Sequence, residues 1–365
     1  MASIISAIGT ANPVNRFAQN ILFDFMADAH QLDAKDMPRL RKLYDVSGIE
    51  YRHSVIADFG VPRGTYSFFG NYEKLEPFPG TKQRSALYEQ SAKYIAVEAV
   101  GNLLKSSDIE AGEFTHLITV SCTGMYAPGL DIDLIEALKL NKSMERTCIN
   151  FMGCYGAFNA LKIADYICRA DHSAKVLIVD VELCTLHFQR ENTMENWVAN
   201  SLFADGAAAV AVVHESDSQL RSGFLLKTFH NSLLTEGRDE MAWRIGDTGF
   251  EMNLSARVPK NISKNICAVA DSLSQKAGIN RSAVNHTAIH PGGRRILEVC
   301  EEMLELPEEA LDHSYDVLKN FGNMSSVTIL FILKRLMEQS APAEKVMSFA
   351  FGPGLTVESM LLEVV

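Results

Sequence analysis

One stretch decides the architecture of this protein: residues 325–337, which read SSVTILFILKRLM. Folded as a helix, its apolar side chains at 327 and 329–333 cover every side, and only Thr328 interrupts them. A helix that is apolar all round is normally central and is covered by other elements on every side. A second helix of this kind is predicted over residues 157–164, apart from two polar positions. Two buried central helices narrow the possible architectures considerably.

Working outward from these helices, strands alternate with helices along the chain. Apolar runs predict strands over residues 3–8, 114–120, 147–150, 175–181, 207–213, 225–230, 287–289 and 346–351. Apolar residues at steps of three and four predict helices over residues 86–104, 130–140, 157–170, 261–277, 295–304 and 325–337. The strand at 207–213 is continuously apolar, which is typical of a strand buried on both faces. This alternation predicts an α/β fold with mainly buried sheets.

The length of 365 residues suggests two domains, or one large domain with two halves. The polar tract from His214 to Arg221 is the predicted boundary, which divides the chain into residues 1–215 and 216–365. Each half contains a loop of small residues followed by an unusually apolar helix. That similarity is compatible with an ancient duplication.

The composition excludes several classes of function. The formal net charge is −11 and no block of Lys and Arg occurs, so a nucleic-acid partner is not expected. The apolar fraction of 47% with only 22% charged residues argues for a buried core. No apolar run reaches the length of about 18 residues that spans a membrane, and the N-terminus lacks signal-peptide features. The seven cysteines contain no C-x-x-C pair, so we expect no metal site and a reducing cytoplasm.

Cys154 is the first candidate for chemistry. It lies between Gly153 and Gly156, after a predicted strand and before a predicted helix. Glycines permit a tight turn there, and the positive end of a helix dipole lowers the pKa of a thiol. A buried structural cysteine is the other interpretation, because free cysteines are commonly buried. Both interpretations stay open from the residues alone.

Two further candidates lie in the second half. His290 closes a predicted strand and meets Pro291-Gly292-Gly293, a position suited to catalysis or to capping the next helix. Asn323 precedes the buried helix, where it would serve as an N-cap or as a neutral donor to an oxyanion. The turn at Gly352-Pro353-Gly354 reads as generic punctuation and precedes no helix, so it is no phosphate loop.

Six ordered motifs together resemble the type III polyketide synthases, the chalcone and stilbene synthase family of the thiolase superfamily. The motifs are AIGTANP (7–13), Gly153-Cys154, LFADGAAA (202–209), HPGG (290–293), GNMSS (322–326) and FGPGLTVE (351–358). The resemblance implies a thiolase-like fold with two similar βαβαβαββ halves that form a five-layer αβαβα core. The first half would then carry the nucleophilic cysteine, and the second the catalytic histidine and asparagine.

The resemblance implies that Cys154, His290 and Asn323 form the catalytic triad. Cys154 would accept a starter from an acyl-CoA, with His290 keeping the thiolate paired. Malonyl-CoA would lose carbon dioxide, and His290 and Asn323 would stabilise the enolate that attacks the thioester. The product is expected to cyclise to a pyrone, resorcinol or related compound. CoA thioesters are substrates in this scheme, and no metal or redox cofactor is expected.

The resemblance also implies a set of substrate-contacting residues and a homodimer. Phe203 matches the family's gatekeeper phenylalanine, and Met252 stands at the second gatekeeper position. The remaining predicted cavity residues are His187, Cys122, Cys184, Gly352 and Pro353. The predicted CoA-binding residues are Arg39, Lys42 and Arg295. His187 and Cys122 depart from the plant pattern, which argues against a chalcone or stilbene product.

Three alternatives compete with this interpretation. A ketoacyl synthase III-like enzyme also uses Cys, His and Asn, but it performs one condensation and takes malonyl groups from an acyl carrier protein. A degradative thiolase needs a second catalytic cysteine near the C-terminus, and no cysteine follows Cys300. A non-catalytic scaffold or acyl-binding module would tolerate loss of Cys154. The ordered motifs favour the polyketide synthase.

Overall fold

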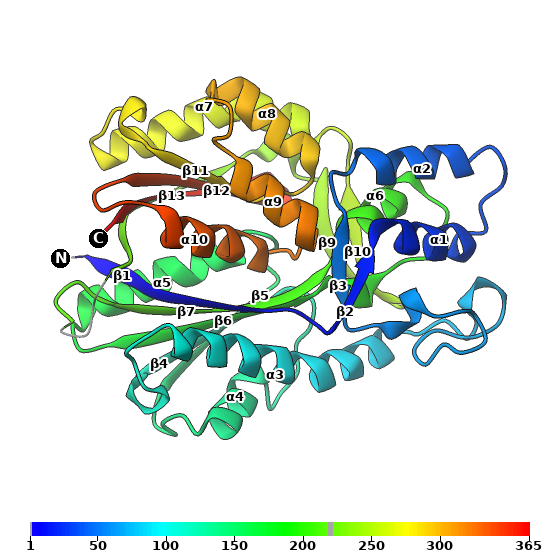
Figure 1. Cartoon of the computed structure of the whole chain (residues 1–365), viewed down its shortest axis with the longest axis horizontal. Helices are drawn as coiled ribbons and strands as arrows, with labels where there is room; N and C mark the ends of the chain where they lie inside the picture. Colours follow the sequence, from blue (N-terminus) through cyan, green and yellow to red (C-terminus); the bar gives the residue numbers. More distant parts are fainter. Residues whose placement is uncertain (1, 218–221) are drawn as a thin grey trace.

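The computed structural model describes residues 2–217 and 222–365, and its elements follow the predicted alternation of strands and helices (Figure 1). The strands are β1 (Ser3–Ala11), β2 (Asn15–Ala18), β3 (Tyr51–Ser54), β4 (His116–Ser121), β5 (Glu145–Asn150), β6 (Lys175–Leu183), β7 (Asp205–His214), β8 (Phe224–Leu233), β9 (Met241–Gly246), β10 (Gly249–Leu254), β11 (His286–Ile289), β12 (Lys345–Gly352) and β13 (Thr356–Val364). The helices are α1 (Gln19–Ala29), α2 (Met37–Val46), α3 (Thr81–Lys105), α4 (Leu130–Leu138), α5 (Gly156–Ala170), α6 (Met194–Leu202), α7 (Val258–Ala277), α8 (Arg294–Leu304), α9 (Asp312–Phe321) and α10 (Val327–Gln339).

The large sheet has two parts with the same topology. Its strand order is β11-β12-β13-β8-β1-β7-β6-β4-β5. In the first half β4 runs parallel to β6, and β7 pairs antiparallel with both β6 and β1. In the second half β11 runs parallel to β12, and β13 pairs antiparallel with both β12 and β8. Among the described residues, Ile4 and Ile5 of β1 pair with Leu225 and Phe224 of β8 and so join the two parts. The shared strand order is compatible with an ancient duplication, which stays a hypothesis.

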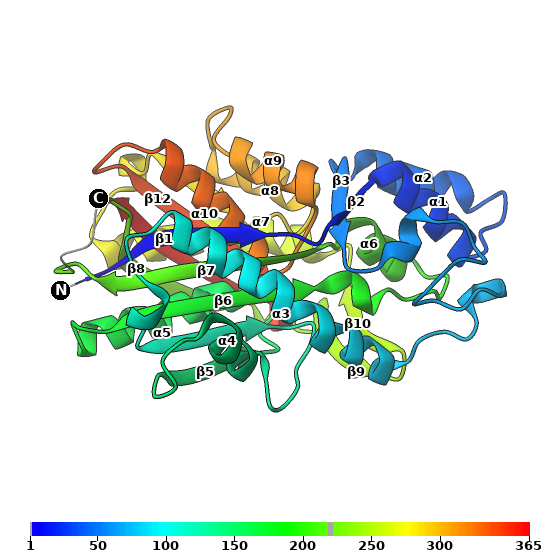
Figure 2. The same ribbon diagram turned by 60° about the horizontal axis from the view of Figure 1, so that its bottom comes forward.

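The helices cover these strands in layers. In Figures 1 and 2, α3 and α4 lie outside the first-half strands, and α7 and α8 lie outside the second-half strands. Between the two parts of the sheet lie α5 and α10, and α5 contacts strands of both halves. The five-layer αβαβα arrangement of a thiolase-like fold is therefore confirmed.

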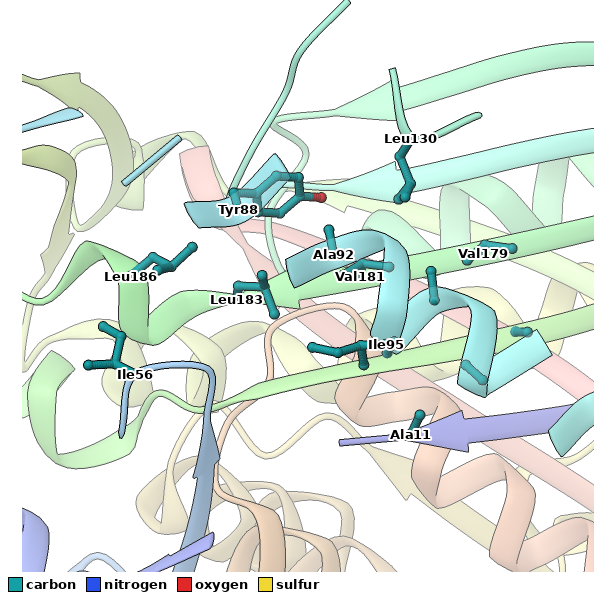
Figure 3. Close-up of a cluster of buried hydrophobic side chains, with 14 of the residues drawn as sticks. Ala11, Ile56, Tyr88, Ala92, Ile95, Leu130, Val179, Val181, Leu183 and Leu186 are labelled. Carbon is teal, nitrogen blue, oxygen red and sulfur yellow. The ribbon is translucent and has the colours of Figure 1, made fainter. Parts of the chain in front are cut away.

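The central position of α10 is confirmed by its burial. Every side chain from Val327 to Leu333 is buried, and the helix packs in one hydrophobic cluster with residues of β1, β6, β7 and α5. In contrast, α5 is buried on one side only, because Ile163 is half-buried and Tyr166 is 63% exposed. A second cluster fills the space between α3 and the first-half strands, as Figure 3 shows for Tyr88, Ala92 and Val179.

Several short elements escape the sequence prediction. They are β2, β3, β9, β10, α1, α2, α6 and α9. Their strands pair only as two-stranded sheets, β2 with β3 and β9 with β10, so they lack the long apolar runs that mark the central strands. The polar tract predicted as a boundary joins β7 to β8; its residues 218–221 lie outside the described residues, and the division at 215 stays a prediction. Within the described ranges, no helix has the length and apolar character needed to cross a membrane.

Candidate active site

Cys154 occupies a tight turn between β5 and the first residue of α5. Gly153 adopts φ +79°, a left-handed conformation that favours glycine. A Cβ atom on Gly153 would lie 2.2 Å from Cδ of Pro353, so the two turns are in direct contact. The chain thus presents Cys154 just before the N-terminus of α5, where the sequence predicts it, with only 8% of its surface exposed.

The turn at Gly352 and Pro353 supports the nucleophile turn. A Cβ on Gly352 would lie 2.5 Å from the ring of Tyr155, the residue that follows Cys154. Generic punctuation is therefore the wrong interpretation of this motif, because the close packing leaves no room for a Cβ atom at Gly352 or at Gly153. Neither Gly352 nor Pro353 is among the residues that line the cavities described below, whereas the preceding Phe351 is.

His290 directly follows β11, and its imidazole ring makes no hydrogen bond with any described residue. The side chain is nevertheless fully buried. The cap position of α8 is held by Gly293. Capping of the next helix is therefore the wrong interpretation of His290, and its ring nitrogens are free to exchange a proton with a neighbour.

Asn323 is held by its side chain and by its backbone. Its Oδ1 accepts a hydrogen bond from the backbone N–H of Ser325 at 2.9 Å, and its Nδ2 donates to the carbonyl of Gly292 at 3.3 Å. Its backbone pairs with the segment at Phe203, with the Asn323 N–H donating to Leu202 O at 2.9 Å. The N-cap of α10 is Ser326, so the capping interpretation of Asn323 is wrong.

Cys154, His290 and Asn323 line one cavity of about 220 Å³. They come from three separate segments: the turn before α5, the end of β11 and the turn before α10. Most of the remaining lining is apolar and is supplied by Met194, Val198, Leu202, Met241, Leu254, Val258, Pro259, Ile296 and Phe351. Such a cavity favours an acyl chain and excludes most water around the thiol.

A smaller inner cavity of about 40 Å³ adjoins the first, and Phe203 and Met252 line both. Cys184 and His187 also line the inner cavity, and so does Trp243, which the sequence analysis missed. A lone tryptophan in a short strand carries no signal of its own. Met252, not nearby Phe250, faces the cavities, which fits the predicted gatekeeper position.

His187 is locked in place. Its Nδ1 accepts a hydrogen bond from the Phe250 N–H at 2.9 Å, so its Nε2 donates to the carbonyl of Thr123 at 2.7 Å. The ring stacks on Phe250 with centroids 4.1 Å apart. Burial lowers the pKa of His187 to about 3. Because both ring nitrogens are hydrogen-bonded within the protein, His187 forms a fixed part of the cavity wall and has no proton to exchange with a substrate.

The other predicted residues lie in different places. The Sγ atom of Cys122 accepts a hydrogen bond from the Gly153 N–H at 2.8 Å, so Cys122 lies behind the nucleophile turn and outside both cavity linings. Arg295 lines the larger cavity and pairs with Glu298 at 3.1 Å. Arg39 and Lys42 are exposed on α2 and line neither cavity.

Burial controls the charge of the site. Burial raises the pKa of the Cys154 thiol to about 12, although a hydrogen bond with Ser325 acts in the opposite direction. Burial likewise lowers the pKa of His290 to about 3. The expected lowering of the Cys154 pKa by the helix dipole is therefore outweighed by desolvation. Both groups are neutral until a proton moves from one to the other.

A thiolase-like fold in which a cysteine, a histidine and an asparagine line one cavity defines a class of condensing and acyl-transfer enzymes. Residues 1–216 match the family described as chalcone and stilbene synthases, N-terminal domain, and residues 226–365 match the corresponding C-terminal domain. The chain therefore belongs to the chalcone and stilbene synthase family. It is a type III polyketide synthase, an acyltransferase that forms carbon–carbon bonds.

Relatives and solved structures agree with this assignment. The α-pyrone synthesis polyketide synthase-like Pks18 of Mycobacterium tuberculosis is 29% identical, over 100% of this chain and 91% of that protein. The 1,3,6,8-tetrahydroxynaphthalene synthase of Streptomyces peucetius subsp. caesius is 28% identical, over 98% and 92%. The C-terminal type III polyketide synthase domain of Steely1, a type I/III hybrid from Dictyostelium, superposes with a TM-score of 0.93 at 27% identity, covering 100% of this chain and 99% of that one.

The nucleophile turn yields a test by substitution. Gly153→Ala forces a left-handed alanine against Pro353, so we expect polyketide formation to fall at least tenfold and the free energy of unfolding to fall by about 1–2 kcal/mol. Gly101→Ala is the matched control, because Gly101 lies within α3 and has open space around it. Urea unfolding should show Gly101→Ala to be slightly stabilising, by about 0.5–1 kcal/mol. Equal stability of Gly153→Ala and the native protein would contradict the packing argument.

The pKa of His290 predicts a pH dependence of stability. His290 has a folded pKa of about 3 against an ordinary value of 6.5, so its contribution is present above pH 6.5 and is lost as the pH falls toward 3. At pH 5 this one residue should cost about 2 kcal/mol of unfolding free energy. The variant His290→Gln should therefore lose less stability between pH 7 and pH 5 than the native protein, measured by urea unfolding. An identical loss in both proteins would show that His290 is not held neutral.

Proposed function

We propose that this polyketide synthase loads an acyl starter on Cys154 and extends it with malonyl-CoA by decarboxylative condensation. Enzymes of this family use acyl-CoA and malonyl-CoA. The observation that carries the proposal is the meeting of Cys154, His290 and Asn323 in one largely apolar cavity. A thiol nucleophile, a proton acceptor and an amide donor are the groups that thioester exchange and condensation require.

In the loading step, His290 takes the proton of the Cys154 thiol. The transfer creates a thiolate and an imidazolium together, and their attraction in a buried site offsets the cost of separating charge. The thiolate attacks the acyl-CoA carbonyl, and CoA leaves with the proton that His290 returns. The free ring nitrogens of His290 support this role, since no protein group competes for them within the described residues.

In the extension step, malonyl-CoA loses carbon dioxide and becomes an enolate. Its oxygen receives hydrogen bonds from His290 and from Nδ2 of Asn323, whose orientation is fixed because Oδ1 accepts from Ser325. The enolate carbon attacks the Cys154 thioester, and the sulfur leaves as thiolate. Decarboxylation supplies the carbon nucleophile without a strong base, so this chemistry needs no metal or redox cofactor.

The cavities bear on the product. We propose that Phe203 and Met252 separate the loading cavity from the inner cavity, where His187 and Trp243 form the far wall. A rigid inner cavity of about 40 Å³ favours short extension, followed by cyclisation to a pyrone, resorcinol or related ring. We propose Arg295 on α8 and Arg39 and Lys42 on α2 as the cations that bind the phosphates of CoA. From the cysteine usage we propose the cytoplasm as the compartment.

We also propose a homodimer formed through β5 and α5. The edge strand β5 is exposed along almost its whole length, and an open sheet edge invites pairing with a second copy. The exposed side of α5 carries Tyr166 and the half-buried Ile163, and Nδ2 of Asn159 has no partner within the described chain. Sedimentation at micromolar concentration should give twice the chain mass of 40.3 kDa, and a monomer would overturn this assignment.

The direct test incubates the purified protein with a panel of acyl-CoA starters and malonyl-CoA and identifies the products by mass. We expect products two carbons or a multiple of two carbons longer than the starter. A parallel reaction with malonyl-acyl carrier protein tests the ketoacyl synthase III-like alternative, which predicts a single extension and dependence on the carrier. Absence of extension from every starter would overturn the proposal.

Two variants assign the roles of the triad. Cys154→Ala should abolish loading and extension, whereas Cys267→Ala, a half-buried thiol on α7, should leave both intact. Asn323→Ala should retain loading of a labelled starter on Cys154 but lower extension by about 10²–10³-fold, as expected for loss of one oxyanion donor. Loading is measured by intact-protein mass and extension by product formation. Equal loss of both activities in Asn323→Ala would contradict the assigned role.

A further inference from the structure

Two carboxylates lie buried behind the nucleophile, and the proposed reaction does not use them. Asp180 and Glu182 lie on β6, and neither side chain has surface exposed to solvent. No salt bridge within residues 2–217 and 222–365 involves either of them. Burying a charged carboxylate without a cation is costly, so this pair requires an explanation.

One hydroxyl joins the two carboxyl groups. The Oγ atom of Ser326 lies 2.9 Å from Oδ1 of Asp180 and 2.9 Å from Oε1 of Glu182. A hydroxyl has one proton and can donate to one of these oxygens only. If both carboxyl groups were ionised, one of the two contacts would join oxygens with no proton between them. At least one carboxyl group must therefore carry a proton.

The other hydrogen bonds indicate which group carries it. Oε2 of Glu182 accepts from the Cys122 N–H at 3.0 Å and from the Thr123 hydroxyl at 2.7 Å, and both donors stabilise a carboxylate. Oδ2 of Asp180 has no partner among the described residues. Asp180 is thus the protonated member: it donates to Ser326, and Ser326 donates to Glu182. Burial raises the pKa of both carboxyl groups, and repulsion from Glu182 raises that of Asp180 further.

The chain of hydrogen bonds continues to the nucleophile. The Cys122 N–H donates to Glu182, and the Cys122 Sγ atom accepts a hydrogen bond from the N–H of Gly153, the residue before Cys154. Ser325 also interacts with both Cys154 and Glu182, and its single hydroxyl proton can be donated to only one of them at a time. Glu182 raises the pKa of Cys154 by charge repulsion, and it does so more strongly than Asp180. A negative charge on Glu182 therefore opposes the Cys154 thiolate more than the same charge on Asp180.

Among the described residues, the other titratable groups on which Glu182 acts carry no positive charge. They are Tyr88 on α3, Cys122 after β4 and Cys184 after β6, each with a pKa raised by burial and by Glu182. These three groups stay neutral at physiological pH. The carboxyl pair acts on the charge of the Cys154 sulfur, and His290 lines the same cavity as Cys154.

We propose that Asp180, Ser326 and Glu182 form a proton relay that moves negative charge away from Cys154 whenever its thiolate forms. The Asp180 O–H bond breaks as its proton passes to Ser326 Oγ, and the original Ser326 proton passes to Glu182 Oε1. One proton moves from Asp180 to Glu182, the charge moves from Glu182 to Asp180, and reacylation of the sulfur reverses both. Asp180 is then a positioning residue that acts through Glu182, and the proposal rests on Cys154 being the nucleophile.

The test is the pH profile of Cys154 alkylation by iodoacetamide, followed by peptide mass. Asp180→Asn keeps a donor to Ser326 but has no proton to give, so Glu182 stays charged next to the sulfur. Because burial raises the pKa of the Cys154 thiol to about 12, the shift is measured as the alkylation rate below that pH; we expect the rate to fall about tenfold, which corresponds to a rise of about one pH unit in the midpoint. Ser326→Ala cuts the same relay and should raise the midpoint in the same direction. Glu182→Gln removes the nearby charge and should lower it.

The opposite signs separate a relay from simple damage to the site. Without a relay, removing a carboxyl group at 180 would leave the midpoint unchanged or lower it, and either result in Asp180→Asn overturns the proposal. If Asp180→Asn does not fold, Ser326→Ala decides by the same criterion. Asp165→Asn is the matched control, a buried acid on α5 paired with Arg169, and it should not move the midpoint. Alkylation needs no substrate, so this outcome is distinguishable from a failure of polyketide formation.

Discussion

The active site depends on the packing of α5 and α10 between two parts of a sheet with the same strand order. In the first half the central helix α5 directly follows the parallel strand β5, whereas in the second half α10 follows helix α9. Cys154 lies at the start of α5 and Asn323 lies just before α10, so the nucleophile and the amide donor occupy corresponding positions. His290 and Cys122, which follow β11 and β4, correspond in the same way. Two equivalent frameworks thus bring Cys154 from the first half and His290 and Asn323 from the second half to one cavity, whereas Cys122 lies behind the nucleophile turn.

Burial gives this site a neutral resting state. The same desolvation that opposes the Cys154 thiolate also opposes the His290 imidazolium, so charge appears only as a pair and only when a proton crosses between them. A thiol in this state is protected from adventitious electrophiles in water. The carboxyl pair behind the sulfur affects the same ionisation, because a negative charge there raises the pKa of the Cys154 thiol and opposes its thiolate.

The sequence predicts the long and strongly apolar elements well, for reasons visible in the structure. α10 is recognisable because every side is buried, and Cys154 because its glycines are needed for the turn and for the contact with Pro353. The family motifs point to His290 and Asn323, but spacing alone leaves capping as an alternative, which is excluded because Gly293 and Ser326 hold the cap positions of α8 and α10. The pairing of β9 with β10, the wall at Trp243 and the sharing of Ser326 by two carboxyl groups arise from contacts between distant segments. No local pattern encodes them.

The two parts of the sheet differ at their outer edges, and this difference limits how copies of the chain can associate. The first half ends in β5, which has no counterpart in the second half, and the opposite edge ends in β11, which is largely buried. Copies joined edge to opposite edge would build an open filament. With one accessible edge, strand pairing can only join like to like about a two-fold axis, which closes after two copies and leaves no growing end.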